Sequence, residues 1–230
     1  MKIEERYKKN IGTIGEEGQE RLLRSHVAIA GAGGLGGFVL EVMLRAGVGR
    51  ITIVDHDAFE ATNLNRQLLA TERTLGMQKT EAAEARAREV NPATRLIAKA
   101  CRLTEANAEE LLEGADVILD CLGNISDRFV VERAARKLGI PMVHAAIAGL
   151  RGQVMTIPPE GKGLSAIYGE QRSAPRSGEE TERGCPPDSV MAMAALQAHE
   201  AMGVLTGREV RSNSVLSVDL ESLEIKKFEV

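Results

Sequence analysis

A glycine-rich segment close to the N-terminus constrains the fold of this chain more than any other feature. Residues 31–36 read Gly-Ala-Gly-Gly-Leu-Gly and lie between an apolar run at 27–30, typical of a short buried strand, and an apolar stretch at 38–46, typical of a helix. Glycines at such a junction allow a tight turn and let backbone N–H groups approach a phosphate at the helix N-terminus. The sequence therefore predicts a strand–turn–helix unit that binds a nucleotide through Gly31, Gly33, Gly34 and Gly36.

The alternation of strand and helix continues over the first 150 residues. Further apolar runs predict strands at 51–54, 95–100, 117–119 and 142–146, separated by predicted helices at 78–90, 105–113 and 127–138. These strands are continuous apolar runs rather than alternating ones, which indicates that helices cover both faces of the sheet. We therefore expect an α/β fold with a Rossmann-like, doubly wound and mainly parallel sheet.

The pattern changes after residue 150. Residues 158–188 are rich in proline, glycine, serine and charge, which is typical of a long functional loop. Antiparallel strands at the C-terminal end are expected to extend the sheet. The remaining elements predicted here are a strand at 153–157, an apolar helix at 188–205, and a hairpin at 213–219 and 223–229. We expect a single domain over residues 1–230, composed of a helical segment at 1–25, a nucleotide-binding half at 26–150 and a C-terminal part at 151–230.

Composition excludes several classes of function. Lys+Arg 29 against Asp+Glu 33 gives a net charge of -4, and aromatic residues make up 3%, so a nucleic-acid-binding protein is disfavoured. No apolar stretch is long enough to span a membrane, and the first residues lack the apolar core of a signal peptide. The cysteines Cys101, Cys121 and Cys185 are widely spaced and form no Cys-x-x-Cys pair. We expect a cytoplasmic protein without zinc.

An acidic residue supports the nucleotide interpretation. Asp55 follows Gly36 by 19 positions and stands at the end of the second predicted strand. An acid at that spacing binds a ribose hydroxyl in dinucleotide-binding folds. A glycine turn that only packs a helix on a sheet would not explain this acid.

Two cations favour a triphosphate over a dinucleotide. Lys79 lies in the first turn of a predicted helix, where a positive charge opposes the helix dipole, so we expect it to face an anion. Arg66 offers a bidentate fork, and the pair is typical of polyphosphate sites. Solvated surface charges are the alternative interpretation of both residues. An NAD-dependent oxidoreductase is disfavoured by these cations but stays open.

A series of short motifs resembles the ThiF/MoeB/HesA family, which is related to the adenylation domains of ubiquitin-activating enzymes. The resemblance is strong over residues 6–150, covers nearly the whole chain and is loose over 158–190. The motifs, in chain order, are Arg6-Tyr7, the glycine segment at 31–36, Ala46-Gly47-Val48-Gly49, Val54-Asp55-His56-Asp57, Asn63-Leu64-Asn65-Arg66-Gln67, Gly76-Met77-Gln78-Lys79, Asn91-Pro92 and Asp120-Cys121.

The resemblance implies an activity and a set of roles. The family adenylates the C-terminal glycine of a ubiquitin-like sulfur-carrier protein with ATP and Mg²⁺, and its members are usually homodimers. By resemblance, Gly34 lies against the nucleotide, Asp55 binds ribose, Asn63 and Arg66 hold phosphates, and Lys79 stabilises charge on the α-phosphate. The other matched positions at the nucleotide are Asp57, Gln67, Gly123 and Asn124. Lys9 is the nearest match to a basic residue that reaches the partner subunit's ATP.

The sequence departs from the family pattern at the end of the fourth predicted strand. The family has Asp-x-x-Asp-Asn there, and its second aspartate binds Mg²⁺. This chain reads Asp120-Cys121-Leu122-Gly123-Asn124, so Gly123 stands where the metal-binding carboxylate is expected. Asp120 and Asp127 are the candidates to compensate as magnesium ligands, although neither occupies the matching position. Efficient adenylation is less secure than ATP binding, and a non-catalytic nucleotide-binding homologue becomes an alternative.

Cysteines define a second departure. The two Cys-x-x-Cys pairs that hold zinc in many members are absent. Cys185 lies in the expected loop before the apolar helix and is a candidate acceptor thiol, with an incidental free thiol as the equal alternative. A further activity within the resemblance is ATP-dependent cyclisation of a modified tRNA adenosine, which the net charge of -4 disfavours.

Overall fold

The computed structural model describes residues 3–170, 183–208, 212 and 214–230. Eight strands form one sheet in the order β3-β2-β1-β4-β5-β6-β7-β8. The first five strands are parallel, and β6, β7 and β8 join them as antiparallel neighbours. This confirms the predicted doubly wound sheet with its antiparallel extension. The strands are β1 His26–Ala30, β2 Arg50–Val54, β3 Arg95–Lys99, β4 Val117–Asp120, β5 Met142–Ala148, β6 Arg151–Ile157, β7 Ser214–Asp219 and β8 Glu224–Glu229.

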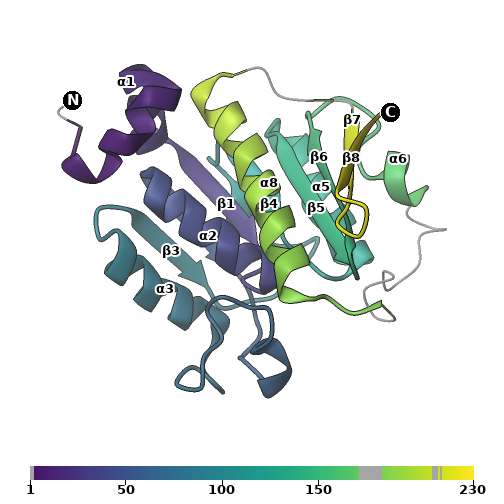
Figure 1. Ribbon diagram of the computed structural model, residues 1–230, viewed down its shortest axis with the longest axis horizontal. Coiled ribbons are helices and arrows are strands. Elements are labelled where there is room, and N and C mark those ends of the chain that lie inside the picture. The colour runs from purple at the N-terminus through teal and green to yellow at the C-terminus, as the bar shows by residue number, and fades with distance from the viewer. Residues whose placement is uncertain (1–2, 171–182, 209–211, 213) are drawn as a thin grey trace.

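Helices cover both faces of the sheet (Figure 1). One hydrophobic core lies between the sheet and α2, α3 and α8, with α1 packed against α8. A second core lies beneath α4, α5 and α6. The strands of the parallel part are therefore buried on both sides, as continuous apolar runs require. The helices are α1 Lys8–Arg24, α2 Gly34–Ala46, α3 Lys79–Val90, α4 Ala108–Leu112, α5 Ile125–Leu138, α6 Ser165–Tyr168 and α8 Pro187–Thr206, with short 3-10 turns at Glu5–Tyr7 and Ala61–Asn63.

Glycine positions set where the main helices begin and end. Helix α2 starts at Gly34, four residues before the predicted start, because its glycine-rich first turn carries little apolar periodicity. It ends at Gly47, whose φ of 86° is a left-handed conformation that favours glycine.

Helix α5 begins after Asn124, whose side chain accepts a hydrogen bond from the Ser126 N–H at 2.8 Å. Asn124 is thus a helix cap at the edge of the predicted nucleotide site.

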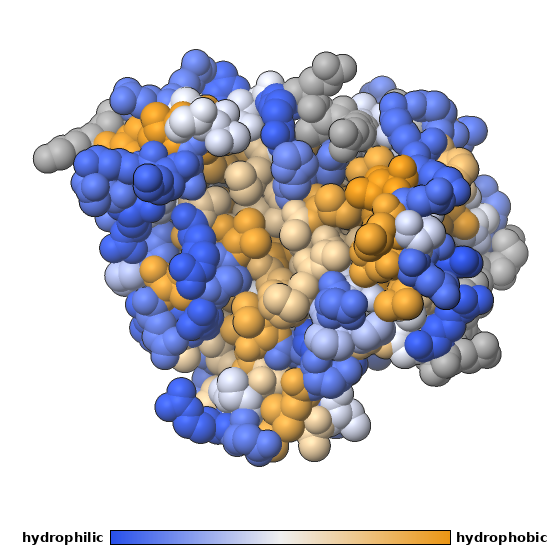
Figure 2. Space-filling model, viewed as in Figure 1, coloured by the Kyte–Doolittle hydropathy of each residue, from blue (hydrophilic) through white to orange (hydrophobic). Residues whose placement is uncertain are grey.

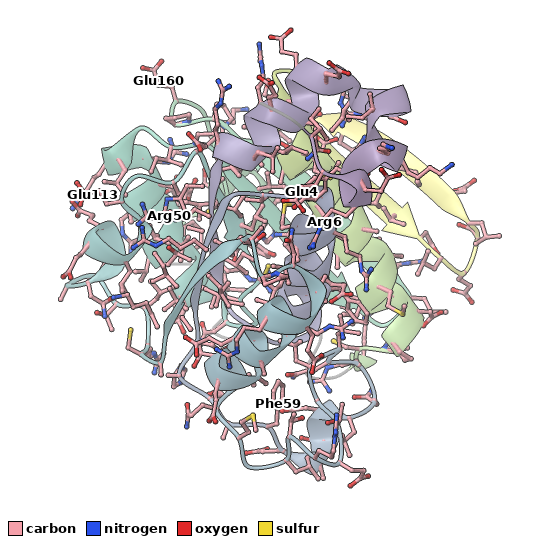
Figure 3. All side chains as sticks on the ribbon, turned by 90° about the vertical axis from the view of Figure 1, so that its left-hand side faces the viewer. Glu4, Arg6, Arg50, Phe59, Glu113 and Glu160 are labelled. Atoms are coloured by element: carbon pink, nitrogen blue, oxygen red, sulfur yellow. The ribbon has the colours of Figure 1, made fainter. Side chains whose placement is uncertain are left out.

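The N-terminal segment is tied to the C-terminal end of α3 by two of the sequence motifs. The Tyr7 hydroxyl accepts a hydrogen bond from Asn91 Nδ2 at 2.7 Å, and Arg6 donates to Asn91 Oδ1 at 3.0 Å. Figure 3 shows Arg6 beside Glu4, with which it forms a 3.1 Å ion pair. The motifs at 6–7 and 91–92 therefore belong to one structural contact, and it lies outside the nucleotide pocket.

The segment predicted as one loop at 158–188 contains a short helix. Residues Ser165–Tyr168 form α6, which packs on the second core through Leu164 and Tyr168. Four residues are too few to show helical periodicity in a sequence, which explains why the prediction missed α6. Residues 171–182 of this segment lie outside the described part of the chain. Among the described helices, none combines the length and apolarity needed to cross a membrane.

Candidate nucleotide site

A pocket of about 400 Å³ lies at the carboxyl ends of the parallel strands. It spans the point where the chain order reverses, between β1 and β4, which is the usual ligand position in doubly wound sheets. Its volume falls within the range of small-molecule sites. The predicted residues that line it are Gly31, Gly33, Gly34, Asp55, Asp57, Arg66, Gln67, Lys79, Gly123, Asn124 and Cys185.

The glycine segment forms the base of the pocket through close backbone contacts. Gly31 has a φ of 98°, and a Cβ there would lie 2.8 Å from the Cys121 carbonyl oxygen. A Cβ on Gly36 would lie 1.9 Å from the Gly31 carbonyl oxygen. Gly36 does not line the pocket. It allows the first turn of α2 to lie against the Gly31 turn, so that the N-terminus of α2 points into the pocket.

Asp55 connects the two loops beside the pocket. Its Oδ2 accepts a hydrogen bond from the Ala32 N–H at 2.7 Å, and its Oδ1 accepts from the Asp57 N–H at 2.8 Å. The carboxylate faces the pocket at the end of β2, as the spacing from Gly36 predicts. Each oxygen retains a lone pair, so a ribose hydroxyl is a chemically suitable further donor.

Lys79 is held at the pocket by Asp57. The Lys79 side chain is 8% exposed, and its Nζ lies 2.8 Å from Asp57 Oδ2. The Lys79 N–H also donates to the Asp57 carbonyl oxygen at 3.0 Å. Partial burial raises the pKa of the Asp57 carboxyl, but the hydrogen bond and charge of Lys79 outweigh it and hold that pKa below its ordinary value. The pair thus places a fixed ammonium group at the N-terminus of α3.

Arg66 and Gln67 come from the connection between β2 and α3, at the lower end of the molecule in Figure 1. Figure 3 shows Phe59 of the same connection at this end, far from Arg50 at the start of β2. The Arg66 guanidinium donates to the Thr62 carbonyl oxygen and to Asn65 Oδ1, each at 2.8 Å.

Gln67 contributes a buried polar group without a partner. It is 7% exposed and lines the pocket. Its Oε1 has no hydrogen-bond partner among the described residues. Buried polar atoms are nearly always satisfied, so this one points to a group that binds in the pocket.

Asn63 is placed differently from the prediction. It is buried at the end of a 3-10 turn and does not line the pocket. Its Oδ1 accepts a hydrogen bond from the Glu60 N–H at 3.1 Å, and its carbonyl oxygen accepts from the N–H groups of Arg66 and Gln67. Asn63 therefore shapes the turn that presents Arg66, and we do not assign it a phosphate contact.

Asp120 does not fit the magnesium role expected of it. It is fully buried and does not line the pocket. Its Oδ2 lies 2.7 Å from His144 Nδ1, and its Oδ1 accepts a hydrogen bond from the Leu122 N–H at 3.1 Å. The side chain points toward β5 rather than into the pocket. Gly123 lines the pocket but has no side chain, so neither position 120 nor position 123 offers a carboxylate there.

Another group of potential metal ligands lies at the pocket. Asp55, His56 and Asp57 place one ligand atom each within 4.8 Å of one another, among the residues that the structure describes. Asp57 is the more accessible carboxylate, with its side chain 51% exposed. Carboxylate oxygens are the ligands that Mg²⁺ prefers, together with phosphates of a bound nucleotide.

All three cysteines line the pocket. Cys121 is buried, and burial followed by the charge of Asp120 raises the pKa of its thiol well above the ordinary value. Cys101 follows β3, and Cys185 precedes α8; both are partly exposed. The Cys185 carbonyl oxygen accepts a hydrogen bond from Asn65 Nδ2 at 3.3 Å. Cys185 thus lies beside the loop that carries Arg66, and its role as an acceptor thiol stays a prediction.

Sequence reasoning missed part of the pocket lining. Arg102 and Leu103 follow β3, while Ala146 and Ile147 lie in β5. Arg102 forms a 3.0 Å ion pair with Asp127 at the start of α5, and both line the pocket. The available signal was position alone, because residues that follow parallel strands meet at one edge of the sheet. Lys9 lies exposed on α1 and does not line this pocket. Its contact with the ATP of a partner subunit stays a prediction.

Comparison with known proteins places this geometry in a family. A profile of the ThiF family matches residues 7–230. The chain belongs to the ThiF family. It is 32% identical over 214 residues to the sulfur carrier protein ThiS adenylyltransferase of Escherichia coli, covering 91% of this chain and 83% of the relative. It is 44% identical over 141 residues to the sulfur carrier protein adenylyltransferase of Thermus thermophilus, covering 61% of this chain and 52% of the relative.

Solved structures of ThiF-like fold agree with the architecture. The crystal structure of Escherichia coli MccB with ATP superposes with a TM-score of 0.82 at 19% identity, over 99% of this chain and 72% of that chain. This likeness concerns the fold. The matched region spans about half the length of the Thermus relative.

Proposed function

We propose that this ThiF-family chain binds ATP in the pocket and adenylates the C-terminal glycine of a ubiquitin-like sulfur-carrier protein that ends in Gly-Gly. The observation that carries the proposal is the placement of Lys79 and Arg66 in one pocket with the glycine turn of α2. Two cations and a helix N-terminus suit a triphosphate. Relatives at 32% and 44% identity are named sulfur carrier protein adenylyltransferases.

The proposed reaction is attack by the glycine carboxylate on the α-phosphorus of ATP. A carboxylate oxygen–phosphorus bond forms, the bond from the α-phosphorus to its bridging oxygen breaks, and pyrophosphate leaves with that oxygen. The reaction needs alignment and neutralisation of charge more than a strong base. Asp55 would hold the ribose, Arg66 the outer phosphates, and Lys79 the charge that develops at the α-phosphate. Gly33 and Gly34 allow the phosphates to approach the N-terminus of α2.

Magnesium fits the pocket at Asp57. Its exposed carboxylate lies beside Asp55 and His56, and a bound triphosphate would supply further oxygens. The ion would add positive charge along the phosphates and so favour the departure of pyrophosphate. The three residues therefore support a proposed Mg²⁺ site, although position 123 offers no carboxylate.

Two further roles belong to the same proposal. Cys185 would receive the activated carrier after adenylation: its sulfur would form a thioester bond with the glycine carbonyl carbon as the bond from that carbon to AMP breaks and AMP leaves. The residue lines the pocket, and its carbonyl oxygen accepts a hydrogen bond from Asn65 in the Arg66 loop. The chain would act as a homodimer through the face of α2 and α8, over which Figure 2 shows apolar residues in the middle of the molecule. Met191 on α8 is 50% exposed. Lys9 of one subunit would then approach the other subunit's nucleotide.

Gly123 favours a second candidate, a nucleotide-binding homologue without turnover. The pocket wall at that position carries no carboxylate. In that case ATP would bind and no carrier would be adenylated. Cyclisation of a tRNA adenosine, the other reaction open to this family, is disfavoured by the net charge of -4.

Calorimetric titration with ATP and with NAD, each with and without Mg²⁺, tests the nucleotide assignment. We expect ATP to bind more tightly than NAD, and Arg66→Ala to raise the ATP dissociation constant about tenfold to a hundredfold, as loss of a charged hydrogen bond does. Arg45→Ala is the matched control, because Arg45 is an exposed arginine of α2 that pairs with Glu41 away from the pocket. Binding of NAD without ATP would contradict the proposal.

A further inference from the structure

A buried hydrogen-bond network runs from the centre of the sheet to the pocket wall. Asp120 at the end of β4 and His144 on β5 are register partners, and both are fully buried. His144 Nδ1 lies 2.7 Å from Asp120 Oδ2. An ionised carboxylate only accepts hydrogen bonds, so the ring proton belongs on Nδ1 and Nε2 is left as an acceptor. Burial also lowers the pKa of His144, against the raising effect of Asp120, which favours this neutral form.

Tyr168 of α6 extends the network. Its hydroxyl lies 3.1 Å from His144 Nε2 and accepts hydrogen bonds from Gln153 Nε2 at 2.9 Å and from the Arg128 guanidinium. With two donors on its oxygen, the hydroxyl directs its own hydrogen to His144. The Arg128 guanidinium carbon also lies 5.7 Å from the centre of the Tyr168 ring. Tyr168 therefore anchors Arg128 to the sheet.

The network is hydrogen-bonded to the connection between β4 and α5. Arg128 Nε donates to the Leu122 carbonyl oxygen at 2.9 Å, and its Nη2 donates to the Gly123 carbonyl oxygen at 3.3 Å. Asp120 Oδ1 accepts from the Leu122 N–H at 3.1 Å. One end of the network thus holds the Leu122 amide, and the other end holds the carbonyl groups of Leu122 and Gly123. Both residues line the nucleotide pocket.

Gly123 makes this support necessary. It has no side chain, and the space where a Cβ would lie has no atom within 4 Å. Gly123 therefore has no side chain that packing could hold, and the hydrogen bond from Arg128 to its carbonyl oxygen helps to fix its backbone.

We propose that His144 and Tyr168 are positioning residues of the nucleotide pocket. Through Arg128 and Asp120 they fix the backbone of Leu122 and Gly123. This backbone forms the wall of the pocket in which the carboxylate and the α-phosphate of the proposed reaction would align. The catalytic part of this inference rests on the proposed adenylation, whereas the structural part does not. Neither residue lines the pocket.

Tyr168→Phe tests the structural part, because it removes one hydroxyl and keeps the ring. Tyr7→Phe is a matched control, since Tyr7 is the chain's other tyrosine and its buried hydroxyl also accepts a side-chain hydrogen bond, from Asn91 outside the pocket. We expect hydrogen exchange at the Leu122 amide to become at least tenfold faster in Tyr168→Phe and to change less than threefold in Tyr7→Phe. Equal exchange in the two variants would overturn the proposal whether or not the protein adenylates a carrier.

Steady-state kinetics test the catalytic part. We expect Tyr168→Phe to lower kcat for carrier-dependent pyrophosphate exchange about tenfold or more, because alignment is sensitive to small displacements. The KM for ATP should change less than threefold, since the glycine turn and Lys79 remain. The double variant Tyr168→Phe with Arg128→Lys should be no slower than the slower single variant, because both substitutions break one path. Additive losses in the double variant would overturn the positioning role. If the wild type is active, equal kcat values in Tyr168→Phe and Tyr7→Phe would overturn it as well.

Discussion

Lys79→Met is expected to lower kcat/KM for carrier-dependent pyrophosphate exchange about 100- to 1,000-fold, the usual loss when a fixed group that stabilises developing charge is removed. Lys79 is expected to act strongly because its side chain is 8% exposed and is fixed by a 2.8 Å contact with Asp57. A charge held in this way is poorly screened by water and needs no reorganisation during the reaction. Methionine keeps most of the aliphatic length and removes only the ammonium group.

The matched control for this substitution is Lys137→Met. Lys137 is an exposed lysine of α5 that forms an ion pair with Glu109, and it does not line the pocket. Its replacement should leave the exchange rate within twofold of the wild type. The thermal unfolding temperature of both variants should stay close to that of the wild type, because Asp57 remains half exposed when Lys79 is lost. If Lys79→Met and the wild type had similar kcat/KM values for pyrophosphate exchange, Lys79 would have no role in the reaction.

Gly36→Ala is expected to abolish ATP binding. It is also expected to lower the free energy of unfolding by about 2–4 kcal/mol, which reaches slightly beyond the usual cost of overpacking a core. The new Cβ would lie 1.9 Å from the Gly31 carbonyl oxygen, which is backbone and has no flexible end that could move aside. The Gly31 turn, with its φ of 98°, would have to shift away from α2. Calorimetry with ATP and denaturant unfolding measure the two effects.

The adjacent glycine supplies the control. A Cβ on Gly37 would lie 3.5 Å from the Leu69 side chain, an ordinary contact distance, and Gly37 is in the same helix. Gly37→Ala should therefore keep ATP binding and raise the free energy of unfolding by up to about 1 kcal/mol, the difference in helix propensity. If both variants bound ATP equally well, the close approach of α2 to the Gly31 turn would not be what shapes the pocket.

The pocket was predictable where local chain geometry determines it. Gly31, Asp55 and Lys79 each stand at the end of a strand or the start of a helix, so the alternation of elements brings them to one edge of the sheet. The order of the elements up to β5 followed from the same alternation, whereas the antiparallel extension was predicted from the hairpin pattern at 213–219 and 223–229.

Side-chain direction could not be read in the same way. Asp120 ends a strand, as Asp55 follows one, yet it points to His144 on β5 and is buried. Asn63 belongs to a matched motif but shapes a turn with Glu60. Spacing places a residue at an edge, whereas the tertiary neighbours decide which partner its side chain takes.

The network around Tyr168 was beyond sequence reasoning for another reason. It joins residues from β4, α5, β5, β6 and α6, which have no shared motif. Tyr168 lies in a segment without periodicity, so its partial burial became apparent only from the packing of α6.

Mass spectrometry of a reaction mixture tests the central claim most directly. The purified chain would be incubated with ATP, Mg²⁺ and a sulfur-carrier protein that ends in Gly-Gly, in parallel with the same carrier whose C-terminal carboxylate is amidated. We predict a gain of one AMP by the free carrier, release of pyrophosphate, and neither product from the amidated carrier. Bound ATP with no adenylated carrier, across carriers that related enzymes accept, would contradict the account and leave this chain as a nucleotide-binding protein without turnover.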